Sequence, residues 1–345
     1  MGAAGPPSYT PRVATRLPTP GDVLAAHARL RGIALDTPLE LAPALAAASG
    51  AEEVRLKLEA VQPTGSFKIR GAHNKLALLS AARDAGEAPD LPVITASSGN
   101  HGIAVAHAAA RYGMSVTILV GHDVSPAKLE WLRSLETDAI TVELKGRDYD
   151  EAEAEARRRE QLGAATYAAP YNDADVIAGQ GTIGLEIMEA WPECDAMLVP
   201  IGGGGLITGI GLWAKAIKPE LRLVGVQPAA SPPMYVYLQT GSTKPVPIAP
   251  TLADGVSGNI ERGSMTWGLS RKVVDSVLLV EEKEIIEAMR WAIDQQRLLL
   301  EASAVLGIAA LLHRGDPGLE GRRVAVICTG RNVDGQAVRR VLSTS

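Results

Sequence analysis

Short runs rich in β-branched residues alternate along this chain with amphipathic stretches, and that alternation limits the folds that the chain can adopt. In the first half, each of three such runs precedes a stretch whose apolar residues recur at helical spacing. The runs are PVITA at 92–96, SVTILV at 115–120 and AITVEL at 139–144, and the helices are expected from about Asn100, from Pro126 and over 148–161. A repeated strand–helix order is typical of a parallel sheet covered by helices, so the sequence predicts an α/β fold.

The same rhythm resumes in the second half of the chain. The runs there are AMLVPIG from 196, RLVGVQP from 222, SVLLV from 276 and RRVAVICTG from 322. With 345 residues, of which 46% are hydrophobic, the chain is long and apolar enough for two packed lobes. We therefore predict two α/β lobes, with the charged helix over 148–161 as a solvated outer face.

Composition and charge argue against several classes of function. The net charge is −5 and no basic run contains interleaved aromatic residues, so neither nucleic acid nor an anionic membrane is favoured as a partner. No apolar run approaches the length of a membrane span. The first residues, MGAAGPPSYTPR, lack the apolar core of a signal peptide and indicate a proline-rich leader. Two cysteines, Cys194 and Cys328, make no disulfide framework and have no metal-ligand spacing, which favours a cytoplasmic location.

The stretch PTGSFKIRGA, residues 63–72, places Lys68 between a turn of small polar residues and the first turn of an expected helix. Ser66 is in position to cap that helix. A lysine in the first turn lies near the positive end of the helix dipole, which lowers its pKa toward that of a nucleophilic or Schiff-base amine. The alternative for this stretch alone is a surface lysine whose stem lies along the helix.

The stretch TASSGNHGIAVAHAAA, residues 95–110, ends an expected strand in small hydrogen-bonding residues and then begins an alanine-rich helix. Hydroxyls and free backbone N–H groups at a helix N-terminus suit a carboxylate. We predict that the acid group of a substrate binds at this turn, which comprises Ser97, Ser98, Gly99, Asn100 and His101. An ordinary helix cap is the alternative, and His101 alone fits a packed structural histidine better than an acid or a base.

Four consecutive glycines, Gly202 to Gly205, follow an expected strand and precede an apolar helix. Without side chains in the way, their N–H groups can point at one anion, which predicts a phosphate cradle. No GK[ST] follows the glycines, which excludes a nucleoside-triphosphate loop. The next strand ends near Gln227 rather than in the acid that would hold a ribose, so a dinucleotide fits poorly. One phosphate ester on a small cofactor remains.

The last expected strand ends at Thr329 and Gly330, and open α/β sheets bind ligands at such strand ends. By itself this is an ordinary strand end. Taken together, a lysine of low pKa, a cradle for one phosphate, a turn for a carboxylate and no metal ligands indicate pyridoxal 5′-phosphate with an amino-acid substrate.

Five motifs, in this order across most of the chain, resemble the threonine/serine dehydratase and serine racemase group of fold-type II pyridoxal enzymes, which are tryptophan synthase β-like. The motifs are LEAVQPTGSFKIRGA, SSGNHG, PYNDADVIAGQGTIGLEI, GGGGL and TLADG. The resemblance implies two lobes, a large cofactor-binding domain of residues 1–88 and 166–345 and a small domain of residues 89–165 that closes over the substrate. It also implies a homodimer or homotetramer.

Carried over residue by residue, the resemblance makes Lys68 the Schiff-base lysine and Phe67 a neighbour that packs against the cofactor. Asn100 would be the partner of the cofactor's phenolic oxygen. Thr329 would meet the pyridine nitrogen, where the family usually has serine. The phosphate would be held by Gly202, Gly203, Gly204, Gly205 and Leu206.

The resemblance and Thr329 together lead us to expect a dehydratase. A neutral hydroxyl does not hold the ring nitrogen protonated as an aspartate would, which favours prompt loss of a β-substituent. The expected reaction converts a 3-hydroxy amino acid such as L-threonine or L-serine into a 2-oxo acid and ammonia, with Lys68 removing the Cα proton. The sequence identifies no acid for the departing hydroxyl.

Three alternatives stay open. A racemase would use Ser98 to reprotonate Cα from the opposite face. A synthase of the cysteine or cystathionine type is disfavoured, because such synthases resemble TSGNTG where this chain has SSGNHG. A pyridoxal-binding protein without turnover would have to account for both Lys68 and the serine turn.

The chain departs from the group's pattern at several places. Arg331 stands where glycine is common, and EASA at 301–304 replaces the more usual EPAGA. These departures leave open a dehydratase for a less common 3-hydroxy amino acid, of the hydroxyectoine-breakdown type. Relatives close to serine racemase bind a divalent cation through carboxylates, which are absent here at Gln227 and near Ser231, so we predict no metal. We also expect no feedback control of the kind that biosynthetic members of the group exert through a further C-terminal region.

Overall fold

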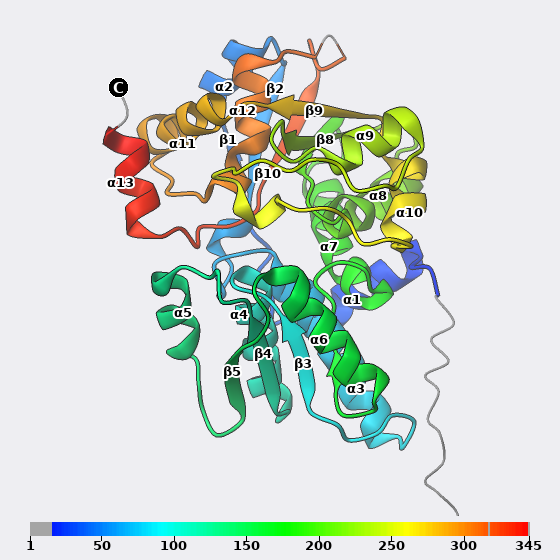
Figure 1. The fold of residues 1–345 in the computed structure, drawn as a ribbon. Coiled ribbons are helices and arrows are strands. Elements are labelled where there is room, and N and C mark those ends of the chain that lie inside the picture. Colours follow the sequence, from blue (N-terminus) through cyan, green and yellow to red (C-terminus); the bar gives the residue numbers. More distant parts are fainter. Residues whose placement is uncertain (1–15, 317, 344–345) are drawn as a thin grey trace, which may run out of the picture.

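The computed structural model of the chain describes residues 16–316 and 318–343, and these residues form two halves, each built around its own sheet (Figure 1). The upper half of Figure 1 holds a six-stranded sheet and the lower half a four-stranded one. In spatial order, the first sheet consists of β1 (Leu39–Leu41), β2 (Glu53–Leu58), β10 (Arg323–Cys328), β7 (Ala196–Pro200), β8 (Arg222–Pro228) and β9 (Ser276–Val280). The second consists of β5 (Ile140–Leu144), β4 (Val116–Val120), β3 (Val93–Ala96) and β6 (Thr166–Tyr167).

All strand pairs are parallel except β1 with β2. The central strands are buried on both faces, which is why they appear in the sequence as continuous apolar runs rather than alternating ones. The predicted α/β fold with parallel sheets covered by helices is therefore confirmed. Strands β8 and β9 have the bounds expected from the sequence, because apolar runs between turn residues mark them clearly.

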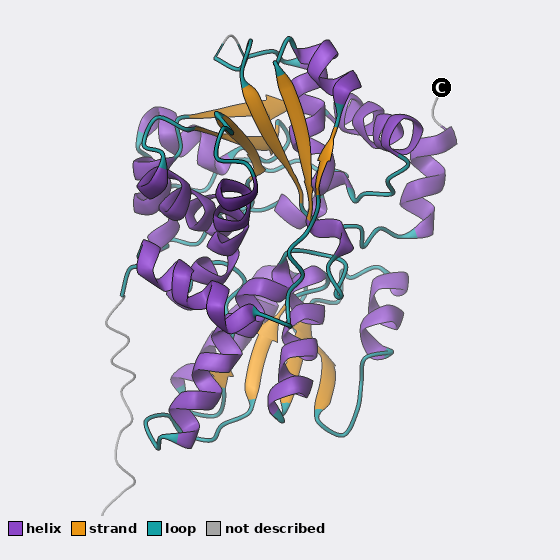
Figure 2. Ribbon diagram, turned by 180° about the vertical axis from the view of Figure 1, so that it is seen from behind, coloured by secondary structure: helices purple, strands orange, loops and turns teal. Residues whose placement is uncertain are grey.

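Helices cover both faces of the six-stranded sheet, as the rear view in Figure 2 shows. One face packs against α2 (Pro43–Ser49), α11 (Glu282–Gln296) and α12 (Leu306–His313). The other face packs against α7 (Ala174–Ala190), α8 (Gly205–Ile217) and α10 (Met265–Val273). The remaining helices of the upper half are α1 (Pro20–Leu30), α9 (Pro233–Thr240) and α13 (Gly335–Ser343). Two apolar cores therefore lie on either side of one sheet.

The lower half contains α4 (Asn100–Tyr112), α5 (Pro126–Arg133) and α6 (Tyr149–Gln161). Helix α3 (Lys68–Asp84) contacts both α4 and α7, so it joins the two halves. The outer side of α6 carries exposed charges as expected, but its first turn lines a cavity through Tyr149 and Ala152. The expectation that α6 is only a solvated outer face is thus incomplete.

The predicted domain boundaries stay a prediction. Strand β6 lies just beyond the predicted limit at residue 165 and nevertheless pairs with β3 of the four-stranded sheet. The predicted proline-rich leader, residues 1–12, lies outside the described residues. In the part of the chain that the structure describes, no helix is both long and apolar enough to cross a membrane.

Candidate functional site

Lys68 is the first residue of α3, the helix that joins the two halves. Its Nζ donates a 2.8 Å hydrogen bond to the carbonyl of Pro170 and lies 5.2 Å from the centroid of the Phe67 ring. Burial lowers the pKa of Lys68 to about 8, and the negative charge of Glu301 opposes this shift. The predicted direction of the shift is confirmed, but the main cause is loss of hydration.

Ser66 does not cap α3, which corrects the sequence prediction. The N-cap residue is Phe67, and no side chain caps the helix. Ser66 instead forms an isolated β-bridge with Gly330, and its buried hydroxyl has no hydrogen-bond partner within the described residues. The bridge holds the Lys68 turn against the end of β10, where Phe67 N–H also donates to the carbonyl of Thr329. A cap is unnecessary because tertiary contacts fix this turn.

A network of side chains surrounds Asn100 at the start of α4. The Asn100 Nδ2 group donates to both carboxylate oxygens of Glu301, at 2.9 and 3.0 Å. Its Oδ1 accepts a 2.7 Å hydrogen bond from Asn332 Nδ2, which also donates to the carbonyl of Thr64. Because both ends of the Asn100 amide are engaged, its orientation is fixed.

Glu301 lies beside Asn100, and the sequence analysis named it within EASA but gave it no role. Burial raises the pKa of its carboxyl to about 7, with the Asn100 hydrogen bond acting in the opposite direction. A Cβ on Gly330 would lie 2.7 Å from Glu301 Oε1, so only glycine leaves room for the carboxylate there. The motif EASA was noted only as a departure. The useful signal was an acidic residue directly before a run of small residues.

The serine turn lies between β3 and α4, where it was predicted. Ser97 Oγ accepts a hydrogen bond from Gly99 N–H, so this hydroxyl closes the turn itself. The hydroxyl of Ser98 has no hydrogen-bond partner among the described residues and lines a cavity. Gly99 is the N-cap of α4 and supplies no side-chain cap, which leaves N–H groups of the first turn available to an anion.

His101 is 4% exposed and packs under this turn. Its Nε2 donates a 3.0 Å hydrogen bond to the carbonyl of Ala168, while its Nδ1 has no partner in the described part of the chain. Burial lowers the pKa of His101 to about 3, helped by the positive charge of Lys68. The ring is therefore neutral at pH 7.

The glycine turn lies between β7 and α8 and is tightly enclosed. A Cβ on Gly203 would lie 2.3 Å from the ring of Tyr171, and Gly204 has a φ of +87°, in the left-handed region. The N–H groups of residues 202–206 donate to no backbone carbonyl among the described residues. They lie at the start of an α-helix of 13 residues, an arrangement that suits a phosphate.

Side-chain and backbone contacts connect these elements into one site. Pro170 accepts from Lys68, and the next residue, Tyr171, packs against the glycine turn. Thr329, which is 3% exposed, lies beside Phe67 and makes no side-chain hydrogen bond within the described residues. The structure thus brings the predicted lysine, serine turn, glycine turn and strand end to one boundary between the halves.

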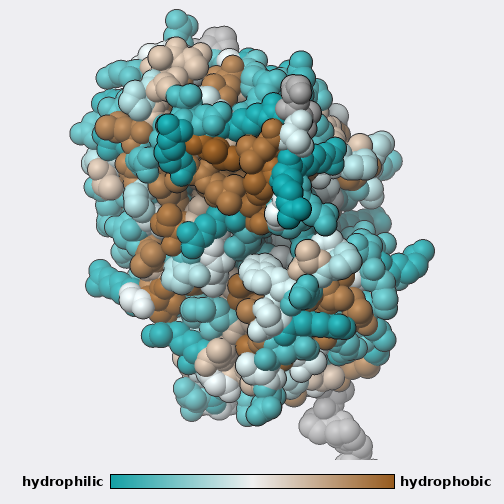
Figure 3. All heavy atoms as spheres, turned by 90° about the vertical axis from the view of Figure 1, so that its left-hand side faces the viewer, coloured by the Kyte–Doolittle hydropathy of each residue, from teal (hydrophilic) through white to brown (hydrophobic). Residues whose placement is uncertain are grey.

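A cavity of about 380 Å³ opens beside the serine turn. One wall comes from the lower half and includes the ends of β4, the following loop and the first turns of α5 and α6. The other wall contains Asp254 and Asp334 of the upper half. Figure 3 shows the face of the molecule on the α5 and α13 side, with apolar side chains gathered on the upper half. The cavity lining is Ser97, Ser98, Leu119, Val120, Gly121, Asp123, Val124, Ser125, Lys128, Tyr149, Ala152, Asp254 and Asp334.

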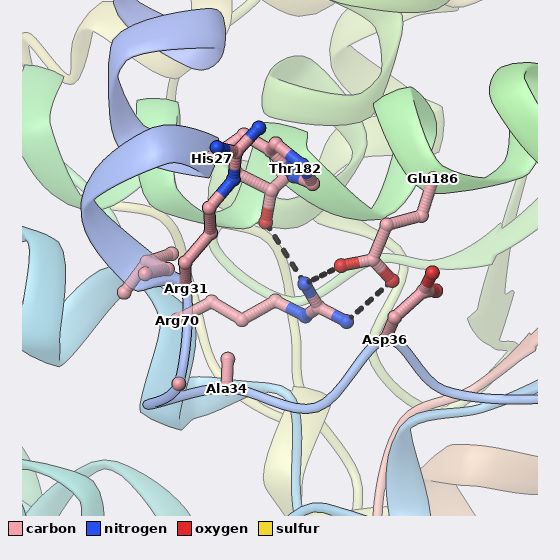
Figure 4. Close-up of a pocket in the computed structure, with 9 residues that line it drawn as sticks. His27, Arg31, Ala34, Asp36, Arg70, Thr182 and Glu186 are labelled. Atoms are coloured by element: carbon pink, nitrogen blue, oxygen red, sulfur yellow. Dashed lines mark hydrogen bonds and ion pairs between the residues drawn. The ribbon is translucent and has the colours of Figure 1, made fainter.

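A second cavity, of about 260 Å³, adjoins a buried ion cluster on the other side of α3 (Figure 4). The guanidinium of Arg70 donates to Glu59, Glu186, Thr182 and the carbonyl of Leu35. Its donors are already occupied, so this cluster holds the fold rather than a ligand. No group of three or more His, Cys, Asp or Glu residues in the described ranges could hold a metal, and Gln227 binds backbone atoms of Ile201 and Tyr235.

Comparison with known proteins gives consistent matches over nearly the whole chain. A model of the pyridoxal-phosphate dependent enzyme family matches residues 30–330. The L-threonine ammonia-lyase of Thermotoga maritima is 38% identical over 322 residues, which are 93% of this chain and 77% of that protein. The L-threo-3-hydroxyaspartate ammonia-lyase of a Pseudomonas species is 36% identical over 91% of this chain and 95% of its own. The structure of maize serine racemase has a TM-score of 0.85 and 30% identity, and the match covers 95% of this chain and 97% of that one.

Proposed function

The chain belongs to the family of pyridoxal-phosphate dependent enzymes, and from this premise we propose that it is an ammonia-lyase. It would remove water from a 3-hydroxy amino acid such as L-threonine or L-serine and release a 2-oxo acid and ammonia. The observation that carries the proposal is Lys68, whose pKa burial lowers to about 8 beside the serine turn. The identity with an L-threonine ammonia-lyase over most of both chains supports the same reaction.

The residues present fit pyridoxal phosphate. The free N–H groups of residues 202–206 suit its phosphate, and the closeness of Tyr171 to Gly203 leaves no room for side chains that would obstruct them. Three buried or partly buried groups near Lys68, namely Ser66 Oγ, His101 Nδ1 and the Thr329 hydroxyl, have no partner among the described residues. Buried polar atoms without partners are uncommon in a site that is complete by itself.

When bound, pyridoxal phosphate withdraws electrons from the α-carbon of the substrate. In the proposed mechanism Lys68 takes the Cα proton at Nζ, which its lowered pKa allows near neutral pH. The N-terminus of α4 and Ser98 bind the substrate carboxylate. Thr329 offers a neutral hydroxyl at the strand end, and Asn100 is held in one orientation by Glu301 and Asn332.

A racemase is the second candidate, because the Ser98 hydroxyl has no partner among the described residues and lines the cavity. The similarity to maize serine racemase favours it as well. In this reaction Lys68 removes the Cα proton on one side and Ser98 returns a proton on the other. No water is lost, so the two candidates differ in their products.

The deciding experiment incubates the holoenzyme with D- and L-serine and D- and L-threonine and measures 2-oxo acid, ammonia and the opposite enantiomer. The proposal expects equal amounts of 2-oxo acid and ammonia from an L-substrate. Interconversion of enantiomers without 2-oxo acid would favour the racemase. Turnover of neither kind across this panel and its longer 3-hydroxy relatives would contradict both.

We also propose a cytoplasmic homodimer or homotetramer without a metal requirement. Two free, buried cysteines, Cys194 and Cys328, support a reducing compartment. Light scattering of the purified holoenzyme tests the oligomer, and a single monomer mass would contradict it. Activity that falls with a chelator and recovers with magnesium would contradict the absence of a metal.

A further inference from the structure

The 380 Å³ cavity beside Ser98 extends beyond the place proposed for the substrate carboxylate. Its volume falls in the range of about 300 to 1,000 Å³ that small-molecule sites occupy, and it is larger than a serine side chain needs. Its apolar lining comes from Leu119, Val120, Val124 and Ala152, all from the lower half. Because Ser97 and Ser98 belong to the same lining, a substrate held at the serine turn would lie against this space.

The lining of the cavity contains more acidic than basic side chains. Three carboxylates line it, those of Asp123, Asp254 and Asp334, and among the described residues the one basic side chain in the lining is Lys128. Lys128 on α5 forms an ion pair with Asp254 across the boundary between the halves. The ammonium is therefore already paired, and two carboxylates remain without a cation among the lining residues.

Asp123 and Asp334 differ in the hydrogen bonds that their carboxylates make. Asp334 Oδ1 accepts a 2.7 Å hydrogen bond from Ala337 N–H, so it caps the start of α13. Asp123 is exposed and makes no side-chain hydrogen bond or ion pair with a described residue. Asp123 is thus the carboxylate that a ligand in the cavity can engage with least rearrangement.

We propose that this cavity selects 3-hydroxy amino acids whose side chain continues into a neutral or positively charged polar group, and that it disfavours side chains ending in a carboxylate. The inference rests on the proposed lyase function and defines its substrate class. It separates this chain from its relative named for L-threo-3-hydroxyaspartate, despite 36% identity.

The physical reason is the cost of placing a third negative group in the cavity. A distal carboxylate would give up hydration and face Asp123 and Asp334. To gain a cation it would have to take Lys128 from Asp254, which would leave Asp254 unpaired. An amide, hydroxyl or ammonium avoids this cost and can donate to the same carboxylates.

The effect of the Lys128–Asp254 ion pair on the pKa of Glu301 also indicates an excess of negative charge. After burial and the Asn100 hydrogen bond, the carboxylate of Asp254 raises the pKa of Glu301 more than Lys128 lowers it. A group next to the cavity therefore experiences more negative than positive charge from this ion pair.

The first test compares L-threo-3-hydroxyaspartate with the matching 3-hydroxyasparagine on the holoenzyme. The two have nearly the same shape and differ in charge. Because the cavity charges are partly exposed and screened, each is worth a severalfold effect, so we expect kcat/KM to be about tenfold higher for the amide. Equal values, or a preference for the acid, would overturn the inference.

L-serine and L-threonine serve as reference substrates in the same assay. If these and the amide give no 2-oxo acid, the lyase proposal itself fails. If they are converted while the acid is preferred over the amide, the lyase proposal stands and the selectivity inference fails. The two failures are therefore distinguishable.

The second test uses Asp123→Asn. Removing this charge should raise the ratio of kcat/KM for the acid to that for the amide about threefold, and high salt should reduce the difference between variant and wild type. Asp138→Asn is the matched control, since Asp138 is exposed and precedes the amino end of β5, whereas Asp123 follows the carboxyl end of the neighbouring parallel strand β4. An unchanged ratio in Asp123→Asn, or an equal change in the control, would contradict the proposal.

Discussion

Helix α3 contributes Lys68 and Arg70 to two clusters of charged groups, half-buried at Lys68 and fully buried at Arg70, and the two clusters are built in opposite ways. Arg70 is 1% exposed, and its donors are taken up by Glu59, Glu186 and Thr182, as Figure 4 shows in part. Lys68 makes one hydrogen bond, to a backbone carbonyl, and lies near groups without partners. The Arg70 cluster is complete as it stands, whereas the Lys68 cluster contains polar groups without partners among the described residues.

The contrast teaches how to separate structural from functional charges in this fold. In the Arg70 cluster, opposite charges offset the loss of hydration. In the Lys68 cluster, burial outweighs the nearest carboxylate, so the pKa values of Lys68 and Glu301 converge to about 8 and about 7. Two groups that titrate near neutrality are useful for catalysis, and the burial of their charged forms lowers the stability of the folded state.

The largest expected effect is on activity, in Lys68→Ala. This variant should lose all measurable turnover and the covalent attachment of pyridoxal phosphate, because no other amine replaces Lys68 at the start of α3. Borohydride reduction followed by mass spectrometry of peptides measures the attachment. The control is Lys283→Ala, which changes an exposed lysine. Label retained in Lys68→Ala would exclude this lysine.

The next effect is on stability, in Arg70→Met. The change leaves Glu59 and Glu186 buried with Lys57 as the nearest remaining cation, so the free energy of unfolding should fall by about 3 to 5 kcal/mol. Urea unfolding measures it. The double variant Arg70→Met/Glu59→Gln should recover part of the loss, since it removes one carboxylate left unpaired. A loss below about 1 kcal/mol in the single variant would refute the structural role.

Much of the Lys68 site could be predicted from the sequence, because its parts depend on local patterns. Lys68 at the start of a helix, the serine turn and the glycine turn follow from spacing and residue type. The buried strands follow from apolar runs. The Ser66 cap was wrong because a bridge to Gly330, more than 260 residues away in the sequence, fixes the turn instead.

The partners of the site residues were not available in this way. Glu301 and Asn332 meet Asn100 from positions 201 and 232 residues further along the chain. Lys128 and Asp254 lie on different halves and meet only because the halves face each other. Such contacts depend on tertiary packing, which spacing within one segment does not encode.

A smaller effect is expected in Glu301→Gln, which keeps an acceptor for Asn100 but removes the charge. Because the Glu301 carboxylate raises the pKa of Lys68, its loss should lower that pKa further. The change in kcat/KM that titration of Glu301 should cause near pH 7 should also disappear. The pH dependence of kcat/KM and of the visible absorbance of the holoenzyme measures both. Unchanged profiles would mean that Glu301 only fills space.

The smallest effect is on the pH dependence of stability and concerns His73, further along α3. Its Nε2 is 2.7 Å from His107 Nδ1, and burial, with the charges of His107 and Arg111, lowers the pKa of His73 to about 3. Because the folded state keeps this ring neutral while the unfolded chain takes up a proton near pH 6.5, its contribution is intact above pH 6.5 and is lost as pH falls toward 3. Between pH 6.5 and 5.5 the loss should be about 1 kcal/mol.

The variant His73→Gln should remove that part of the dependence of the free energy of unfolding on pH. Glu301 with the opposite sign and His101 with the same sign also titrate in this window, but they are common to both proteins and cancel in the difference. Urea unfolding of both proteins at pH 7.5, 6.5 and 5.5 measures the slopes, and parallel lines would show that His73 is protonated in the folded state as readily as in the unfolded chain.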